Sequence, residues 1–392
     1  MKEGWEYIAF KDVYPIKMGK TPPRGDKSSW DEKKETHNKW VSIADISNNE
    51  GKIIEDTKEY ISDSAAEKIN KVSKGSLLMS FKLSIGRMAF AGDDLYTNEA
   101  IIAIPENEKY ILRFIYYYLL SYNWLSLTEG NEKVKGATLN KTSIGKIQLP
   151  VLSFIEQQSI VDYLDSAFAK IDAMEANAEK ALNEAKALFQ ASLKEMLEPK
   201  EGIKWSTIGD LFETYSGGTP TKSNKEYYEG GSIPWLRSGE VCQKEITETE
   251  MFITEKGLKE SSAKYYPENT VVVAMYGATA AQVGILRIKS TSNQAVCGIL
   301  PNKDFLPEFV YYWFSSIENK LAAQAQGGAQ PNISQQKIKK VEIPLYSIIK
   351  QQSIVETLDS LKSKVDRLQE NYDKISQECD VLKQAILRQV FE

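Results

Sequence analysis

Histidine and cysteine are scarce in this chain of 392 residues, which has one histidine and three cysteines. A Ser-His-Asp triad needs a histidine, and His37 lies in the polar stretch "DEKKETHNKW", which favours a solvated loop. The cysteines form no CxxC pair, so we expect neither a zinc cluster nor a disulfide framework. We therefore expect no metal site.

The sequence also lacks the common cofactor motifs. "GKT" at Gly19 resembles the end of a P-loop, but the glycine that the motif needs five positions earlier is replaced by Tyr14. No GxGxxG follows an expected strand, and the Asn/Asp-Pro-Pro-Tyr signature of amino-methyltransferases is missing. We expect no catalytic residue and no cofactor in this chain.

Long apolar runs and an excess of positive charge are missing too. No apolar run could span a bilayer, and "MKEGWEYIAF" has no signal-peptide core, so we expect a cytoplasmic protein without membrane contact. The net charge is −5, which by itself disfavours binding to phosphates. However, residues 151–200 (5 basic, 9 acidic) and 341–392 (7 basic, 9 acidic) hold this deficit, and the rest can carry basic patches.

The chain contains an internal duplication. Residues 147–172 ("IQLPVLSFIEQQSIVDYLDSAFAKID") align with 341–366 ("VEIPLYSIIKQQSIVETLDSLKSKVD") at an offset of 194, with 13 of 26 positions identical. Twice 194 nearly equals the chain length, so two copies fill almost the whole chain. We expect a globular domain at 1–150 (head 1), a helix at 151–200, a second globular domain at 201–343 (head 2) and a helix at 344–392.

Both helical segments carry an apolar seam with steps of three and four residues, as in a coiled coil. The seam of the first is rich in alanine and that of the second in large residues, so we expect the two helices to pack on each other. The alternative is two separate amphipathic helices. In an antiparallel pair, Glu392 should lie near Trp5, and Glu198 near Trp205. The expected seam includes Met174, Leu188 and Leu382.

The heads are related more weakly than the helices. "MGKTPPR" (18–24) matches "SGGTPTK" (216–222), "WVSIADI" (40–46) matches "WLRSGEV" (235–241), and "TNEAIIAI" (97–104) matches "SNQAVCGIL" (292–300). β-branched runs broken by glycines predict strands, and the aromatic runs at 116–118 and 311–313 predict packed helices rather than base-stacking platforms. Each head is expected to be an α+β domain.

The order of these motifs resembles the specificity subunit of type I restriction–modification systems over essentially the full length. The motifs are the GxTP loops, "IPWLRSGEV" (233–241), "TSNQAVCGILP" (291–301), "GGAQPNIS" (327–334) and the two QQSIV segments. The resemblance implies two pseudo-twofold-related α+β target-recognition domains joined by two long helices in an antiparallel coiled coil. It implies double-stranded DNA as a partner, with each head reading half of a bipartite, asymmetric site.

The resemblance also implies that the helices set the spacing and bind two methyltransferase subunits. Restriction/translocase subunits would then join through the complex. The glutamines at 157–158 and 351–352 are expected on the repeated surface. The alternatives are the specificity subunit of a type II-like modification system, or a two-headed scaffold that does not bind DNA.

Base edges are read by exposed Arg, Lys, Asn, Gln, Ser or Thr side chains on loops. In head 1 the DNA-binding candidates are Lys20, Thr21, Arg24, Lys82, Arg87, Lys133, Lys135 and Thr138. In head 2 they are Thr219, Lys222, Arg237, Tyr276, Thr279, Gln282, Gln326, Gln330 and Asn332.

Overall fold

The computed structural model describes residues 2–127, 135–198, 201–324 and 332–392. The chain folds as two compact units: unit 1 is Met1–Asn177 with Asp373–Glu392, and unit 2 is Ala178–Tyr372. Each unit holds one head and one part of each long helix. The domain boundaries predicted from the sequence differ from these units because they do not divide the long helices. They stay a prediction.

Head 1 is built around a central sheet with two antiparallel pairings and one parallel edge. Its spatial order is β3 (Ile53–Ile54), β7 (Met88–Ala91), β5 (Leu77–Ser80) and β9 (Ile101–Ile104). A second sheet has the order β4 (Glu59–Tyr60), β2 (Lys39–Val41) and β8 (Tyr96–Thr97). Two further pairs join β1 (Glu6–Ala9) to β11 (Gln148–Val151), and β10 (Lys135–Thr138) to β6 (Lys82–Ser84).

Head 2 repeats this plan. Its central sheet has the order β13 (Thr214–Ser216), β20 (Val296–Ile299), β17 (Val271–Ala274), β18 (Val283–Leu286) and β15 (Glu245–Ile246). The smaller sheets are β16 (Phe252–Ile253), β14 (Ile233–Leu236) and β19 (Thr291–Ser292), and the pair β12 (Trp205–Thr207) with β21 (Glu342–Pro344). The central strands β5 and β17 are buried along their whole length, which explains the apolar runs Leu77–Met79 and Val271–Ala274.

Most helices in the heads are short. In head 1 they are α1 (Ile43–Asn48), α2 (Asp63–Ala66), α3 (Leu112–Ser121) and α4 (Lys141–Gly145). In head 2 they are α6 (Ile208–Leu211), α7 (Glu255–Lys259), α8 (Pro307–Ser316), α9 (Glu318–Ala322) and α10 (Gln335–Lys339). The aromatic runs lie in α3 and α8, mostly with buried rings, so the prediction of packed helices is confirmed.

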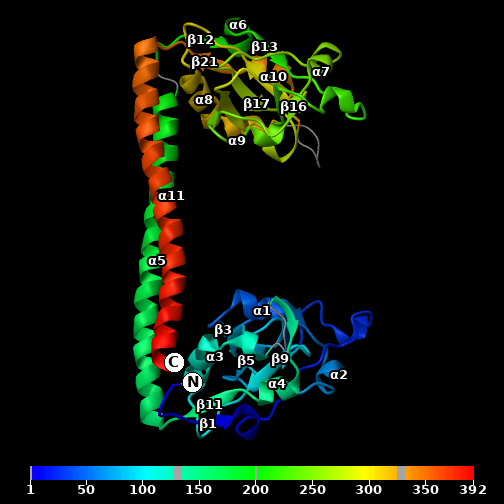
Figure 1. Ribbon diagram of the computed structural model, residues 1–392, viewed down its shortest axis with the longest axis vertical. Coiled ribbons are helices and arrows are strands. Elements are labelled where there is room, and N and C mark those ends of the chain that lie inside the picture. Colours follow the sequence, from blue (N-terminus) through cyan, green and yellow to red (C-terminus); the bar gives the residue numbers. More distant parts are fainter. Residues whose placement is uncertain (1, 128–134, 199–200, 325–331) are drawn as a thin grey trace. The chain divides into compact units, whose positions relative to one another are not determined.

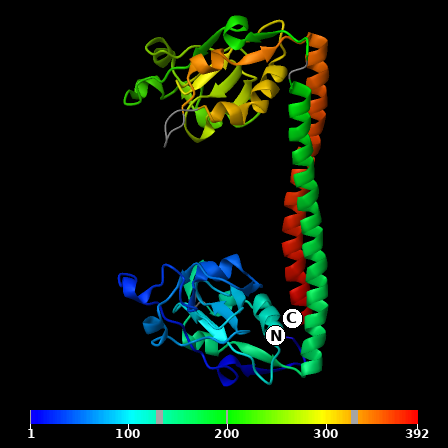
Figure 2. The ribbon, with the colours of Figure 1, turned by 180° about the vertical axis from the view of Figure 1, so that it is seen from behind.

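The two repeated segments form α5 (Phe154–Leu197) and α11 (Ile348–Phe391), of 44 residues each. Figures 1 and 2, drawn from opposite sides, both show the two helices side by side within each unit. As residue numbers rise along α5, those of the α11 partners fall, so the predicted antiparallel pairing is confirmed. In unit 1, Ser376 donates to Glu175 over 2.5 Å and Lys383 pairs with Asp172 at 2.6 Å.

The expected heptad seam is wrong in detail. Met174, Leu188 and Leu382 are 58%, 59% and 45% exposed. In α5 the residues turned away from solvent include Ile171, Glu175, Ala178, Leu182, Ala185 and Phe189, in steps of four and three. The three-and-four spacing is therefore kept, but every second position of the expected seam is one residue off the inward face, as Met174 is from Glu175 and Leu188 from Phe189.

The end of each long helix completes the core of a head. Phe391 lies edge-on to Trp5, with ring centroids 6.4 Å apart, in the core cluster of head 1. Leu197 belongs to the core cluster of head 2, against which Trp205 packs. The expected return of each helix end to a head is therefore confirmed within each unit.

The expectation that the repeated glutamines lie on the surface holds for Gln158 and Gln352, which are exposed, but is wrong for the other two. Gln157 and Gln351 are fully buried, because their side chains reach into the heads. The side-chain oxygen of Gln157 accepts the backbone N–H of Ile111 at 2.9 Å, and that of Gln351 accepts the N–H of Leu306 at 2.9 Å. These N–H groups lie at the starts of α3 and α8, where no helical partner is available.

Candidate nucleic-acid interface

The GxTP loop of head 1 is held against the end of β8. A Cβ atom on Gly19 would lie 2.0 Å from the carbonyl oxygen of Thr97, so only glycine fits there. The backbone N–H of Lys20 donates to this oxygen at 2.8 Å, and the indole of Trp40 donates to the carbonyl of Lys20 at 3.2 Å. The loop is therefore fixed by two motifs that are distant in the sequence.

Head 2 builds the same arrangement with different residues. A Cβ on Gly217 would lie 2.2 Å from the carbonyl oxygen of Ser292, to which the N–H of Gly218 donates at 2.8 Å. The indole of Trp235 donates to the carbonyl of Gly218 at 2.9 Å. The three motifs shared by the heads thus meet at one place in each.

The side chains that contact the threonine of the GxTP loop differ in chemistry between the two heads. In head 1 the hydroxyl of Thr21 donates to Glu99, and in head 2 the hydroxyl of Thr219 donates to Gln294. The Thr21 hydrogen bond lowers the pKa of Glu99, and both Glu99 and Gln294 are exposed. A carboxylate only accepts hydrogen bonds, whereas an amide also donates. The sequence reasoning missed Glu99 and Gln294, although both occupy the same position of a repeated motif.

A second loop pair brings several predicted residues together. In head 1, β10 pairs with β6 so that Thr138 lies opposite Lys82 and Lys135 opposite Ser84. In head 2 a single bridge joins Tyr276, which is 38% exposed, to the exposed Asn332. The predicted residues Lys133, Gln326 and Gln330 lie outside the described residues.

The hairpin turns beside these pairs contain strained backbone. Leu83 has φ 63° and is 60% exposed, whereas the matching position in head 2 is Gly277. Conversely, Ala281 has φ 77° where head 1 has Gly86. Left-handed backbone costs a non-glycine residue about 1–2 kcal/mol. Such residues concentrate at functional sites, so the turns belong to the candidate interface.

The three predicted arginines are already paired with carboxylates in the structure. The pairs are Arg24 with Glu59, Arg87 with Glu50 and Arg237 with Glu250. The guanidinium of Arg24 also stacks on the ring of Trp30, 4.2 Å from its centroid. Contact of these arginines with a phosphate would require each to exchange or share its carboxylate.

The other candidates differ in exposure. Lys20 and Lys222 are exposed and have no ion pair within the part of the chain that the structure describes. Thr279 is half-buried and its hydroxyl donates to the carbonyl of Tyr276 at 3.4 Å. Gln282 is also half-buried, and its side-chain oxygen lies in the interior. Lys20 and Lys222 could therefore contact a phosphate without giving up an ion pair to a described residue.

Two other properties of the described residues bear on the type of site. None of the described helices is both long and apolar enough to cross a membrane. Across residues 2–127, 135–198, 201–324 and 332–392, no three His, Cys, Asp or Glu side chains are grouped to hold a metal ion. The candidate site is thus a surface of loops with polar side chains.

The family model for the type I restriction modification DNA specificity domain matches residues 2–184 and again residues 200–377. This chain belongs to that family. Among curated relatives, the EcoR124I/EcoR124II specificity subunit of Escherichia coli is 29% identical over 276 residues, covering 68% of this chain and 67% of that protein. The MjaIX specificity subunit of Methanocaldococcus jannaschii is 33% identical over 172 residues, covering 43% of this chain and 38% of that protein.

Solved structures support the specificity-domain fold. A chain from a structure of a type I restriction–modification system, described in terms of complex assembly and conformational transition, matches with a TM-score of 0.78. It is 18% identical, and the match covers 100% of this chain and 98% of that one. The HsdS subunit from Thermoanaerobacter tengcongensis matches with a TM-score of 0.59 at 16% identity, covering 100% and 97%. The predicted α+β heads with long paired helices are confirmed.

Proposed function

We propose that this chain is the DNA-reading subunit of a type I restriction–modification complex. Head 1 reads one half of a bipartite, asymmetric site on double-stranded DNA, and head 2 reads the other half. The helices α5 and α11 set the distance between the half-sites and bind two methyltransferase subunits. Restriction/translocase subunits join through that complex.

One observation carries this proposal. Both heads hold a GxTP loop against a strand end with the same backbone hydrogen bonds, yet they present different side chains there. Head 1 has Glu99 and Lys82 where head 2 has Gln294 and Tyr276. Constant loops with variable polar tips suit two modules that read different bases through hydrogen bonds.

The reading function is tested by sequencing DNA methylation in the source cell with this gene present and deleted. We expect a bipartite methylated motif to disappear with the gene. Residues 1–150 are then replaced by the matching head of a relative, which should change one half-site and leave the other half-site and the spacer unchanged. A swap that alters both half-sites would contradict separate reading by the heads.

The proposal also assigns the chain no catalytic step. The chain has the single histidine His37, whose side chain is exposed in head 1. Purified chain, given S-adenosylmethionine and DNA with the motif, should therefore transfer no methyl group. Label incorporated by the isolated chain would refute this assignment.

A repeated apolar surface supports the docking of two equal partners. Ile155 in unit 1 and Ile349 in unit 2 occupy matching positions and are 83% and 82% exposed. They are flanked by Val151 and Phe154 (48% and 49% exposed) in unit 1, and by Leu345 and Ile348 (39% and 38%) in unit 2. Contiguous exposed apolar residues mark interaction sites. Their recurrence in both copies suits one methyltransferase subunit on each.

The substitution Ile155→Asp tests this docking surface, because a buried unpaired carboxylate opposes an apolar interface. Native mass spectrometry should show two methyltransferase subunits on the unchanged chain and one on the variant. Tyr163→Asp is the matched control: Tyr163 is 51% exposed on the same helix, but the second copy has Thr357 there. Two bound subunits on Ile155→Asp, or one on the control, would count against this surface.

A further inference from the structure

The repeated phrase attaches each long helix to a head at two polar points. The first is the buried glutamine at the start of the helix. The side chain of Gln351 accepts the N–H of Leu306 at 2.9 Å and donates to the carbonyls of Asp304 at 2.8 Å and Tyr346 at 2.9 Å. This point fixes the helix end to the loop before α8, and Gln157 does the same before α3.

The second point lies eight residues further along each helix, at an aspartate. In unit 1, Asp165 accepts hydrogen bonds from the guanidinium of Arg113, at 3.0 and 2.9 Å, and from the hydroxyl of Tyr117. Both donors come from α3. Arg113 also lies over the ring of Tyr117, 5.0 Å from its centroid. Burial raises the pKa of Tyr117, and the bond to Asp165 raises it further, so the phenol stays a donor.

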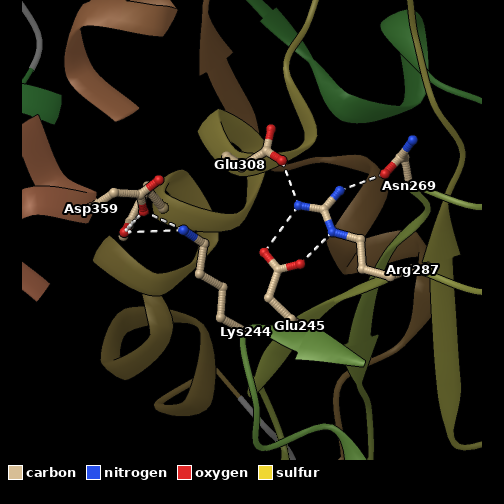
Figure 3. A network of polar contacts seen from close by, with 7 residues as sticks. Lys244, Glu245, Asn269, Arg287, Glu308 and Asp359 are labelled. Carbon is tan, nitrogen blue, oxygen red and sulfur yellow. Dashed lines mark hydrogen bonds and ion pairs between the residues drawn. The ribbon is translucent and has the colours of Figure 1, made fainter. Parts of the chain in front are cut away.

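Unit 2 keeps the aspartate and the tyrosine but takes its cation from another element. Asp359 accepts from the hydroxyl of Tyr312 and pairs with Lys244, the residue before β15. Lys244 lies over the ring of Tyr312, 4.8 Å from its centroid, as Arg113 lies over Tyr117. Figure 3 shows Lys244 pointing toward Asp359 on the long helix.

The two heads carry opposite charges at the matching position of α3 and α8. The position of Arg113 is occupied in head 2 by Glu308, the second residue of its helix as Arg113 is of α3. Glu308 is bound by Arg287 at 2.5 Å, which also binds Glu245 at 3.0 Å (Figure 3). Head 1 has Gly92 at the position of Arg287, because both follow the matching strands β7 and β18.

Head 1 also has a lysine, Lys52, at the position that matches Lys244. The carbonyls of Lys52 and Lys244 accept the N–H groups of Phe90 and Ile285, which hold matching places in β7 and β18. Lys52 is exposed and makes no ion pair with any described residue. The two units thus build the same attachment in two ways, each with an aspartate on the helix, a tyrosine on the head, and a cation from one of two places.

We propose that Asp165 and Asp359 are positioning residues that fix the orientation of each head on its helix, and that this orientation restricts the spacer the protein accepts between half-sites. The glutamine and the aspartate are about 12 Å apart along the helix, at 1.5 Å per residue. Apolar contacts also join each helix to its head, but they are non-directional, so the two polar points set the angle between helix and head. A shift of about 2 Å at the second point turns the head by about 10° over this lever.

The exposure of the two aspartates argues that they affect the orientation of the heads more than the stability of the fold. The carboxylates of Asp165 and Asp359 are 44% and 42% exposed, and ion pairs that open to solvent contribute little to folding. Both units keep the aspartate although its cation comes from different places. A role in positioning the head explains this better than a contribution to stability. This inference rests on the proposed reading of DNA by the heads.

The test is Lys244→Met, with methylation sequencing of cells that carry each variant together with its modification partner. The unchanged chain should methylate its motif at one spacer length. The variant should also methylate sites whose spacer differs by one base pair, and its preference for the correct spacer should fall about tenfold, the factor for 1.4 kcal/mol. Lys52→Met is the matched control, with the same substitution at the same strand position, and should leave spacer choice unchanged.

The variant Lys244→Met with Glu308→Arg and Arg287→Gly gives head 2 the cation of head 1 at no change in net charge. It should restore the strict spacer, which a general loss of folding would not allow. Unchanged spacer choice in Lys244→Met, failure of the triple variant to restore it, or relaxed spacing in Lys52→Met would overturn the positioning role. If the unchanged chain directs no bipartite methylation, the proposed function itself fails.

Discussion

Truncation of Phe391 to alanine should destabilise head 1, although this residue is the last but one of the chain. Its side chain is 3% exposed and lies edge-on to Phe114 and Tyr118, with centroids 5.8 and 5.5 Å apart, as well as to Trp5. Loss of a buried Phe side chain costs about 3–5 kcal/mol. A helix end can partly close the space, so we expect about 3 kcal/mol, near the lower bound.

The corresponding residue of the first helix is Leu197, which is 2% exposed in the core of head 2. Leu197 lines a cavity of about 760 Å³ in unit 2, together with Trp205 and Trp313. Phe391 holds the matching position in the core of head 1, where its ring is enclosed by aromatic side chains. A loss of about 3 kcal/mol lowers the melting temperature of a unit of this size by about 6–12 °C.

Hydrogen exchange measured by mass spectrometry separates the two units, since each opens with its own free energy. In Phe391→Ala, amides of β5 and α3 should exchange faster, while those of β17 and α8 should not. Val381→Ala is the control: Val381 is 69% exposed on the same helix, and surface changes usually stay within about 0.5 kcal/mol. Equal effects of the two substitutions, or equal acceleration in both units, would refute the assignment of Phe391 to the core of head 1.

Two further predictions concern the reading of DNA. Glu99→Gln keeps an acceptor for the hydroxyl of Thr21 but adds a hydrogen-bond donor. A methylation map should therefore show a change at one position of the head 1 half-site, with the other half-site intact. An unchanged motif would rule out base reading by Glu99. Deleting residues 178–184 together with 372–378 shortens each long helix by about 10 Å, so the spacer should shorten or binding should fail. An unchanged spacer on this deletion would show that the helices do not set the distance.

The duplication was enough to predict the architecture, because an offset of 194 relates whole domains rather than single motifs. The seam was harder to predict. Met174 and Leu188 were the apolar choices for the seam, but the inward positions beside them are Glu175 and Phe189. Gln157 looks like a surface residue in a polar phrase. Its burial depends on Ile111, 46 residues earlier.

The candidate interface was partly predictable for a similar reason. The sequence predicts Lys82 and Thr138 as exposed loop residues, and the structure places them opposite each other on paired strands. The carboxylate that binds Arg24 lies 35 residues further along the chain, at Glu59, and nothing local to the arginine indicates it. Glu99 was within reach of sequence reasoning, because its motif recurs with glutamine at the same place.

The positions that the two copies share, and those in which they differ, explain how heads could be exchanged without redesign of the helices. Asp165 and Asp359 lie on the helices, outside residues 1–150 and 201–343, whereas both types of cation lie inside those ranges. A head therefore brings its own cation, from either the strand or the helix position, to an acceptor that does not change. Grafts cut before the helix preserve this match, whereas a graft with neither cation leaves the aspartate to its tyrosine alone. The boundaries proposed from the sequence, at 150 and 343, separate the acceptor from its donors at this junction.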